Sequence, residues 1–255
     1  MAHIDPSAKI GENVTIDPFV FIDKDVVIGD DCHIASHACL YAGTRLGKRV
    51  QVFPGAVIGA IPQDLKFAGE YSTATVGDDT VVREYVTINR GTIERKSTDV
   101  GKNCLLMAYV HIAHDCHVGN NVILANNVNL AGHVKIADHA ILEGLVAVQQ
   151  FIRIGQHSFV AGGSLVRKDI PPYVKAAREP ISFAGTNRIG LQRRGFSDAN
   201  VEDIAKIYRI LFKSGLNTSN ALEKIKAEMN GSIHSQEIVE FIKSSQKGIM
   251  RGFNA

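Results

Sequence analysis

A repeat of six residues runs through most of this chain and restricts its possible folds more than any other feature. Aliphatic residues recur at every sixth position from Ile10 to Ile58, from Val76 to Ile88 and from Val100 to Val166, and each of these anchor positions is Ile, Leu or Val. The residue two before an anchor is usually small or β-branched, and glycine often follows the anchor. A period of six matches neither the 3.6-residue turn of an α-helix nor a hairpin meander.

The period is typical of short strands separated by tight corners, with three strands in each coil of a stacked prism. Side chains alternate along a strand, so we expect the anchor and the residue two before it to point inward. The pattern resembles the hexapeptide repeat of left-handed parallel β-helices over roughly residues 4–170. That resemblance implies the left hand, which is an exception to the right-handed rule for parallel crossovers. An ordinary all-β sandwich is the alternative.

The repeat also divides the chain into domains. We predict an all-β left-handed parallel β-helix over residues 1–172, a linker over 173–190 and an α-helical C-terminal domain over 191–255. Residues 61–75 and 91–99 lack anchors, and we predict that they leave the prism as excursion loops. Loops on a rigid scaffold commonly carry function.

Helical periodicity replaces the repeat after the Pro-Pro pair at 171–172. It predicts helices over residues 198–213, 219–229 and 235–247. We expect Ser197, Thr218 and Ser235 to cap the N-terminal ends of these helices, and Gly215 and Gly231 to end helices.

The composition argues against two classes of partner. The formal net charge is +2 and 21% of the residues are charged, which favours binding neither to nucleic acid nor to a membrane surface. No apolar segment approaches the ~20 residues that a membrane-spanning helix needs. The first residues lack the pattern of a secretory signal, and the four cysteines lack the spacing of a disulfide framework. We therefore predict a cytoplasmic protein with free thiols.

The segment 111–119, HIAHDCHVG, places three histidines at three-residue intervals. Cys116 lies two before an anchor, so we expect it to point inward as a small buried hydrophobe. His111 and His117 each precede an anchor and point outward on adjacent faces, so one metal ion cannot readily bind both. His114 lies two after an anchor, outward and near a corner.

Residues eighteen apart stack in one column, about 4.8 Å per coil. Gly132 and then Gln150 lie above His114, and His133 lies above Asp115. A glycine removes the side chain beside the imidazole and exposes a backbone N–H. A base, a bare amide and flanking polar groups suit acyl transfer, which needs proton removal from a hydroxyl and stabilisation of an oxyanion. The alternative is a surface histidine without a chemical role.

Five motifs carry a resemblance to a known family. They read HIAHDCHVGNNVILANNVNLAGHV, QDLKFAGE, VTINRGT, DIPPYV and LQRRGFS, and they are similar to the cytoplasmic UDP-N-acetylglucosamine acyltransferases that open lipid A biosynthesis. The similarity covers nearly the whole chain. It implies a homotrimer with active sites in the clefts between neighbouring prisms. It also implies transfer of a 3-hydroxyacyl chain from acyl carrier protein to the glucosamine 3-hydroxyl of UDP-N-acetylglucosamine.

The resemblance implies roles for single residues, carried over motif by motif. His114 is similar to the catalytic general base, Asp115 to the residue that orients it, and Gly132 to the backbone oxyanion donor. The residues similar to substrate-binding groups are Asp64, Lys66 and His111 for the sugar nucleotide, His133 and Gln150 for the acyl donor or substrate, and Asn187, Arg193 and Arg194 for the nucleotide. Gly162 is similar to the far end of the acyl groove, which implies a long acyl chain. No metal ion and no cofactor is implied.

The chain departs from this family at Gln149 and Asn89, where members often carry histidine. Three alternatives share parts of the pattern. A related N-acyltransferase of the same pathway carries an extra N-terminal domain, for which we expect no room because the repeat begins by residue 4. The γ-type carbonic anhydrases use the same prism and bind zinc with histidines across a subunit interface, but they lack the QDLK loop and the helical tail. A catalytically silent scaffold is the third alternative.

Overall fold

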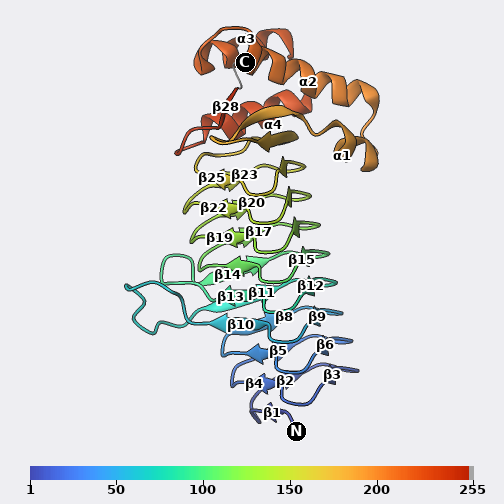
Figure 1. Cartoon of the computed structure of the whole chain (residues 1–255), viewed down its shortest axis with the longest axis vertical. Coiled ribbons are helices and arrows are strands. Elements are labelled where there is room, and N and C mark those ends of the chain that lie inside the picture. Colours follow the sequence, from blue (N-terminus) through green and yellow to red (C-terminus); the bar gives the residue numbers. More distant parts are fainter. Residues whose placement is uncertain (253–255) are drawn as a thin grey trace.

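The chain folds as a tall three-sided prism with helices packed on its C-terminal end (Figure 1). The computed structural model describes residues 1–252. Successive strands of each coil lie on successive sides of the prism, so each side is a parallel sheet. The predicted left-handed parallel β-helix with a helical C-terminal domain is confirmed.

Each side of the prism is one sheet, and we number the sheets in chain order. The first sheet contains β1 (His3–Ile4), β4 (Phe21–Ile22), β7 (Cys39–Leu40), β10 (Val57–Ala60), β13 (Thr87–Asn89), β16 (His111–Ile112), β19 (Asn129–Leu130), β22 (Ala147–Val148) and β25 (Leu165–Val166). The second contains β2 (Lys9–Ile10), β5 (Val27–Ile28), β8 (Thr44–Leu46), β11 (Thr73–Val76), β14 (Ser97–Val100), β17 (His117–Val118), β20 (Lys135–Ile136) and β23 (Arg153–Ile154).

The third sheet continues into the C-terminal region. It contains β3 (Thr15–Ile16), β6 (His33–Ile34), β9 (Gln51–Val52), β12 (Val81–Val82), β15 (Leu105–Leu106), β18 (Ile123–Leu124), β21 (Ile141–Leu142), β24 (Phe159–Val160), β26 (Val174–Ala177), β27 (Ser182–Thr186) and β28 (Arg251–Gly252). The first corner of the prism follows the strands of the first sheet, the second corner those of the second, and the third corner those of the third.

The anchors form the core, as the repeat predicts. Anchors in the middle of the stack, such as Ile58 and Leu124, are fully buried. The N-terminal end is the exception: the first anchor, Ile10, is 38% exposed, and Ile4, six residues before it, is 42% exposed. These side chains have no coil beneath them, so the N-terminal end of the core is open to solvent.

Most corners turn through the left-handed region of the backbone map at the third residue after an anchor; the corners that open into the excursion loops do not. Asp115 has φ 60°, His133 has φ 62° and Leu145 has φ 64°. Non-glycine residues adopt this region infrequently, and Asn, Asp and His do so most readily. The regular recurrence of this turn keeps the strands in register from coil to coil.

Two excursion loops leave the first corner, in adjacent coils. One spans residues 61–72 between β10 and β11, and the other spans residues 90–96 between β13 and β14. The predicted loops, 61–75 and 91–99, extended too far, because their last residues form the beginnings of β11 and β14. Thr73 and Ser97, the first residues of β11 and β14, pair in parallel, although both come before the anchors Val76 and Val100. Both loops project from the same side of the prism (Figure 1).

Strands and a short helix occupy the segment predicted as a linker. β26 and β27 pair antiparallel and extend the third sheet, and α1 (Arg188–Arg193) follows them. The domain limits 1–172, 173–190 and 191–255 remain a proposal, and residues 253–255 lie outside the described part of the chain.

Three longer helices follow: α2 (Asp198–Lys213), α3 (Thr218–Glu228) and α4 (Ile233–Lys243). Ser197 caps α2 as predicted, because its side chain accepts from the Asn200 N–H. The predicted caps Thr218 and Ser235 are wrong. The residues that cap α3 and α4 are Asn217 and Ser232, whose side chains accept an N–H three residues on.

Polar contacts fix the helices to the last coils of the prism. The buried Tyr208 hydroxyl of α2 donates to the Pro172 carbonyl at 2.6 Å. The Arg153 guanidinium lies 4.2 Å from the centre of the Phe241 ring of α4. None of the helices within residues 1–252 is long and apolar enough to cross a membrane.

Candidate active site

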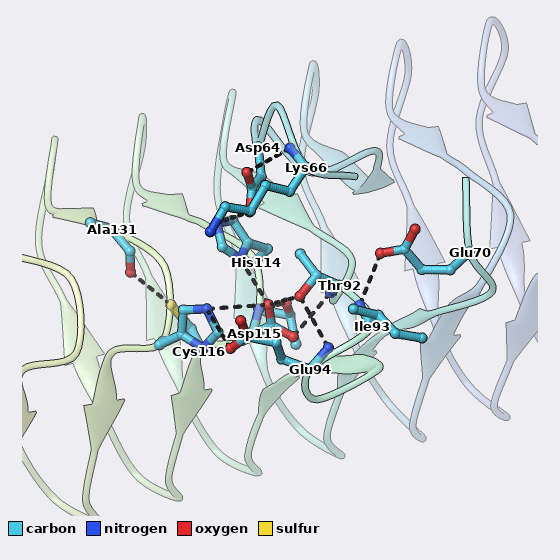
Figure 2. Close-up of polar contacts among 12 residues, drawn as sticks. Asp64, Lys66, Glu70, Thr92, Ile93, Glu94, His114, Asp115, Cys116 and Ala131 are labelled. Carbon is cyan, nitrogen blue, oxygen red and sulfur yellow. Dashed lines mark hydrogen bonds and ion pairs between the residues drawn. The ribbon is translucent and has the colours of Figure 1, made fainter. Parts of the chain in front are cut away.

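His114 lies at the first corner, directly after β16, where the two excursion loops cover it (Figure 2). Its side chain points away from the core as predicted, yet the residue is only 6% exposed. The repeat predicted the direction of this imidazole but not its burial. Asp64 of the first excursion loop lies close to the imidazole, and Gly132 and His133 of the next coil pack beside it. The six-residue period does not describe the loop.

Asp115 forms a hydrogen-bonded pair with His114. One carboxylate oxygen, Oδ2, lies 2.8 Å from His114 Nδ1. Thr92 of the second loop donates twice to the same carboxylate, from its hydroxyl to Oδ2 at 2.7 Å and from its N–H to Oδ1 at 3.0 Å. Burial raises the pKa of Asp115, but the hydrogen bonds from Thr92 and His114 outweigh burial and hold that pKa below its ordinary value. Asp115 is therefore a charged group that fixes the ring of His114.

The other ring nitrogen of His114 faces the first excursion loop. Asp64 Oδ2 lies 4.0 Å from His114 Nε2, and Asp64 Oδ1 accepts the Lys66 N–H at 3.0 Å. The Lys66 side chain runs back toward His114 (Figure 2). The structure thus brings Asp64, Lys66 and His114 together, although the two loop residues are about fifty positions away in the sequence.

Gly132 stacks on His114, one coil above. A Cβ atom built on Gly132 would lie 2.6 Å from His114 Cε1, so no side chain fits beside the imidazole. The Gly132 N–H donates no hydrogen bond within residues 1–252, whereas its carbonyl accepts from Phe151. An amide without an acceptor next to a buried imidazole is the arrangement predicted from the column.

His133, next to Gly132, also lines the site; we call these two residues, in the coil above His114, the wall of the site. Its ring stacks on Phe151 at 4.6 Å and meets His114 edge-on at 5.2 Å. Its Nε2 lies 3.7 Å from Asp115 Oδ2 and 3.6 Å from Glu94 Oε2, so acidic groups flank it on two sides. Gln150 lies one coil above Gly132 in the same column and is exposed.

His111 lies on the first sheet below this wall, and His117 lies on the second sheet, as predicted. The Nδ1 atom of His111 is 2.7 Å from the Thr87 hydroxyl oxygen. Burial, and then the neighbouring His114, lower the pKa of His111, so its imidazole is neutral at neutral pH and able to accept or donate a hydrogen bond.

Cys116 points into the core, as predicted, and donates to the Ala131 carbonyl at 3.1 Å. Burial raises the pKa of its thiol to about 12. A thiolate is the reactive form of cysteine. Cys116 is therefore not the nucleophile of this site.

A metal ion is a poor fit to this cluster. His114, Asp115 and His133 present ligand atoms within 4.8 Å of one another. Both oxygens of Asp115, however, already accept hydrogen bonds from Thr92, and Oδ2 also lies at hydrogen-bond distance from His114 Nδ1. These contacts orient a base rather than form an open set of ligands.

The remaining residues predicted for the site lie on other corners. Asn187 is buried against the second corner, where its side chain donates to the His157 carbonyl at 2.9 Å. Arg193 is the last residue of α1 and Arg194 is its C-cap. Burial, and then the charge of Arg194, lower the pKa of His139 at the same corner. Gly162 lies at the third corner. A single chain therefore does not bring these four residues to His114.

The two departures from the family pattern lie in different surroundings. Asn89 is buried and donates to the Ile61 carbonyl at 3.0 Å, so it fixes the start of the first excursion loop. Gln149 is exposed beside Gln150.

The sequence did not predict three residues around the His114–Asp115 pair, which we call the dyad: Thr92, Glu94 and Glu70. Glu70 accepts the Ala68 N–H and the Ile93 N–H, both at 2.9 Å, and so ties the two loops together. All three lie in segments without anchors. Glu70 ends the QDLKFAGE motif and Thr92 ends the VTINRGT motif, but the resemblance gave neither residue a role, and Glu94 had no signal beyond the gap in the repeat.

Comparison with known proteins identifies the family. Two family models match: the second domain of UDP-N-acetylglucosamine O-acyltransferase over residues 169–250, and the bacterial transferase hexapeptide over residues 7–42 and 97–132. An acyl-[acyl-carrier-protein]–UDP-N-acetylglucosamine O-acyltransferase of Myxococcus xanthus (strain DK1622) is 44% identical over 209 residues, covering 82% of this chain and 81% of the relative. The enzyme of that name from Xanthomonas oryzae pv. oryzae (strain PXO99A) is 41% identical over 252 residues, covering 98% and 96%.

Solved structures agree with these relatives. A UDP-N-acetylglucosamine acyltransferase from Bacteroides fragilis 9343 superposes with a TM-score of 0.96 at 52% identity, covering 98% of both chains. One from Francisella novicida superposes with a TM-score of 0.95 at 38% identity, covering 99% of this chain and 93% of that one. The overall fold is thus shared over almost the whole length. This chain belongs to the acyl-[acyl-carrier-protein]–UDP-N-acetylglucosamine O-acyltransferase family and is an acyltransferase.

Proposed function

We propose that this enzyme transfers a 3-hydroxyacyl chain from acyl carrier protein to the glucosamine 3-hydroxyl of UDP-N-acetylglucosamine, the first step of lipid A biosynthesis. The names of its relatives support the two substrates. The single observation that carries the chemistry is the buried His114–Asp115 pair beside the Gly132 N–H, which has no acceptor among residues 1–252.

The proposed mechanism uses three groups of this chain. His114 Nε2 removes the proton of the sugar hydroxyl while the hydroxyl oxygen attacks the carbonyl carbon of the acyl thioester. Asp115 holds the proton on Nδ1 and stabilises the imidazolium that forms. The Gly132 N–H donates to the oxyanion of the tetrahedral intermediate. The intermediate then expels the carrier thiolate, which takes the proton back from His114.

Loop and wall residues hold the substrates in this proposal. Asp64 and His111 lie within reach of a sugar placed over His114 Nε2, and Lys66 adds a positive charge beside it. His133 and Gln150 face the acyl donor from the coils above. This arrangement accounts for the close approach of the first excursion loop to the imidazole.

A homotrimer completes the site. The phosphate-binding candidates Asn187, Arg193 and Arg194 lie at the second corner and His114 lies at the first, so a neighbouring copy has to supply one set. Arginine suits a diphosphate because its planar fork pairs two oxygens at once. Exposed apolar side chains along the third corner support an interface: Phe19, Tyr85, Tyr109 and Leu145 are each at least 55% exposed.

A direct assay tests this proposal. Purified protein is incubated with UDP-N-acetylglucosamine and a panel of 3-hydroxyacyl carrier proteins, and the product mass is determined. We expect a singly O-acylated sugar nucleotide, and a fall in turnover of ~10²–10⁴ in His114→Ala, the scale of one general base. Light scattering should give the mass of three copies for both wild type and His114→Ala. Thermal melts of the two proteins should give equal unfolding midpoints. No product with any donor, or normal turnover in a folded His114→Ala protein, would contradict the proposal.

A further inference from the structure

The carboxylate of Asp115 is held by a residue to which neither the repeat nor the resemblance assigns a role. Asp115 is 1% exposed, so water does not orient its carboxylate. Thr92, 5% exposed, donates to both oxygens, through its hydroxyl to Oδ2 and through its N–H to Oδ1. An ionised carboxylate only accepts hydrogen bonds, so the Thr92 hydroxyl is the donor in this contact. Figure 2 shows Thr92 between Asp115 and the rest of the second loop.

The double contact fixes the rotation of the carboxylate. The terminal torsion of an aspartate is broad and close to two-fold, so one hydrogen bond to His114 would leave it free to pivot. Two donors from one residue set the plane of the group and keep Oδ2 opposite His114 Nδ1. That placement keeps the proton on Nδ1 and leaves the lone pair of Nε2 to face Asp64 and the substrate.

Thr92 is itself held firmly. The Lys96 N–H donates to the Thr92 carbonyl at 2.7 Å. The next residue, Ile93, donates its N–H to Glu70 of the first loop at 2.9 Å. The position of the hydroxyl is therefore set by both excursion loops and does not depend on the imidazole.

We propose that Thr92 is a positioning residue of the transferase, which orients Asp115 and through it selects the Nδ1–H tautomer of His114. The inference rests on the proposed function, since it assigns Thr92 to the same base. Thr92 touches neither substrate in this scheme and acts only through Asp115.

The pair Thr92→Val and Thr92→Ser separates the hydroxyl from the shape of the side chain. Valine keeps the size and the N–H but removes the hydroxyl, whereas serine keeps the hydroxyl. We expect Thr92→Val to lower kcat about tenfold with KM for the sugar nucleotide unchanged, because the lost contact supports the base rather than binding. We expect Thr92→Ser to restore most of that rate. Equal loss in both variants, or none in Thr92→Val, would overturn the proposal.

The pH profile gives a readout that a merely structural role would not move. Without the hydroxyl, the charge of Asp115 is compensated mainly by His114, so the imidazolium form gains and the pKa of His114 rises. We expect the acidic limb of kcat/KM to move to higher pH by about half a unit to one unit. The charged and titratable groups that face the pair are unchanged in every variant: Asp64, Lys66, Glu94, His111 and His133.

Thr98→Val is the matched control. The Thr98 hydroxyl is fully buried and accepts the Asp115 backbone N–H at 2.9 Å, but it does not contact the carboxylate. We expect this variant to lower the thermal unfolding midpoint and to leave the acidic limb in place. An equal shift of the limb in Thr98→Val would show that any loosening of Asp115 suffices, and would overturn the assignment to Thr92.

A measurement without substrate separates this inference from the proposed function. Protein labelled with 13C,15N-histidine is titrated by NMR, with His114→Asn to assign the His114 ring signals. A higher His114 pKa in Thr92→Val than in wild type supports the positioning role even if the wild-type protein fails to acylate UDP-N-acetylglucosamine. An active wild type with equal His114 pKa values in both proteins overturns the positioning role and leaves the proposed function standing.

Discussion

His114 and Cys116 lie two residues apart, yet the prism gives them different chemistry. Cys116 points inward, where burial raises the pKa of its thiol to about 12. His114 points outward and forms a hydrogen bond with the charged carboxylate of Asp115. The direction of each side chain follows from its distance to the anchor at Ile112 or Val118. A shift of one residue in this register would exchange buried and outward positions.

Gly162 offers a test of the acyl-chain preference. Its Cβ would meet only the Gly144 carbonyl at 3.2 Å and the side chain of Glu143, and its backbone lies outside the left-handed region, unlike Gly163 at φ +71°. The backbone conformation therefore allows a side chain at this corner, and the Gly144 carbonyl has to shift slightly to admit it. If the acyl groove ends here, Gly162→Met fills it, and each methylene no longer buried costs ~0.8 kcal/mol of binding. We expect the preferred donor to become shorter.

The measurement is the ranking of kcat/KM across 3-hydroxyacyl carrier proteins of increasing length. Ala161→Met, one residue earlier in the same turn, is the control for added bulk. An unchanged ranking in a folded Gly162→Met protein would remove Gly162 from the groove.

At the scale of elements, the two excursion loops behave as one clasp over the dyad. Glu70 accepts one N–H from each loop, and the Arg90 guanidinium lies 5.4 Å from the centre of the Phe67 ring. Hydrogen bonds to the Glu70 carboxylate, first from its own N–H, hold its pKa below the ordinary value despite some desolvation. The clasp is therefore complete at neutral pH and is lost only as the pH falls through that lowered pKa.

Glu70→Gln should loosen both loops together. The amide replaces one acceptor by a donor, so the N–H of Ala68 or Ile93 loses its partner. We expect hydrogen exchange at pH 7 to accelerate by about tenfold in peptides covering residues 61–72 and 90–96. Glu84→Gln, which removes an exposed ion pair with Arg83 away from the loops, is the control. Faster exchange in one loop alone would show that the loops move separately.

How much of these elements could be predicted depends on whether a repeat describes them. The prism, the inward cysteine and the column of His114, Gly132 and Gln150 followed from a period of six and a coil of eighteen. The roles of Thr92 and Glu70 could not be predicted from the repeat. Individual hydrogen bonds fix the course of each loop, and these bonds do not recur along the sequence. The caps of α3 and α4 were misplaced for a related reason. Several cap-type residues lie within one turn of each helix start, and only the backbone geometry decides which one accepts.

At the scale of the whole molecule, one chain holds the base and the phosphate-binding candidates on different corners. If a trimer joins them, each site draws His114 from one copy and Arg193 from its neighbour. Arg193→Ala should then raise KM for the sugar nucleotide more than it lowers kcat, because a diphosphate contact is made equally in the ground and transition states.

Mixed trimers test the shared site directly. His114→Ala and Arg193→Ala chains, each carrying a different affinity tag, are co-expressed and purified through both tags. We expect the mixture to recover turnover at low sugar nucleotide concentration, because some interfaces combine an intact His114 with an intact Arg193. The two variants purified separately and mixed without exchange are the control. No recovery in the doubly purified protein would place both residues in the site of one chain.

The parallel register limits which distances between the dyad and α1 an enzyme of this fold can have. A coil without an excursion loop pairs residues eighteen apart, as His111 with Asn129, and adds about 4.8 Å of height. Inserting or deleting one whole coil between the first-corner dyad and α1 would preserve every side-chain direction and move the two apart or together by one step. No intermediate spacing is available without breaking the ladder of hydrogen bonds. Point substitutions change how firmly a substrate group is held, whereas the number of coils alone changes how far apart two groups are held.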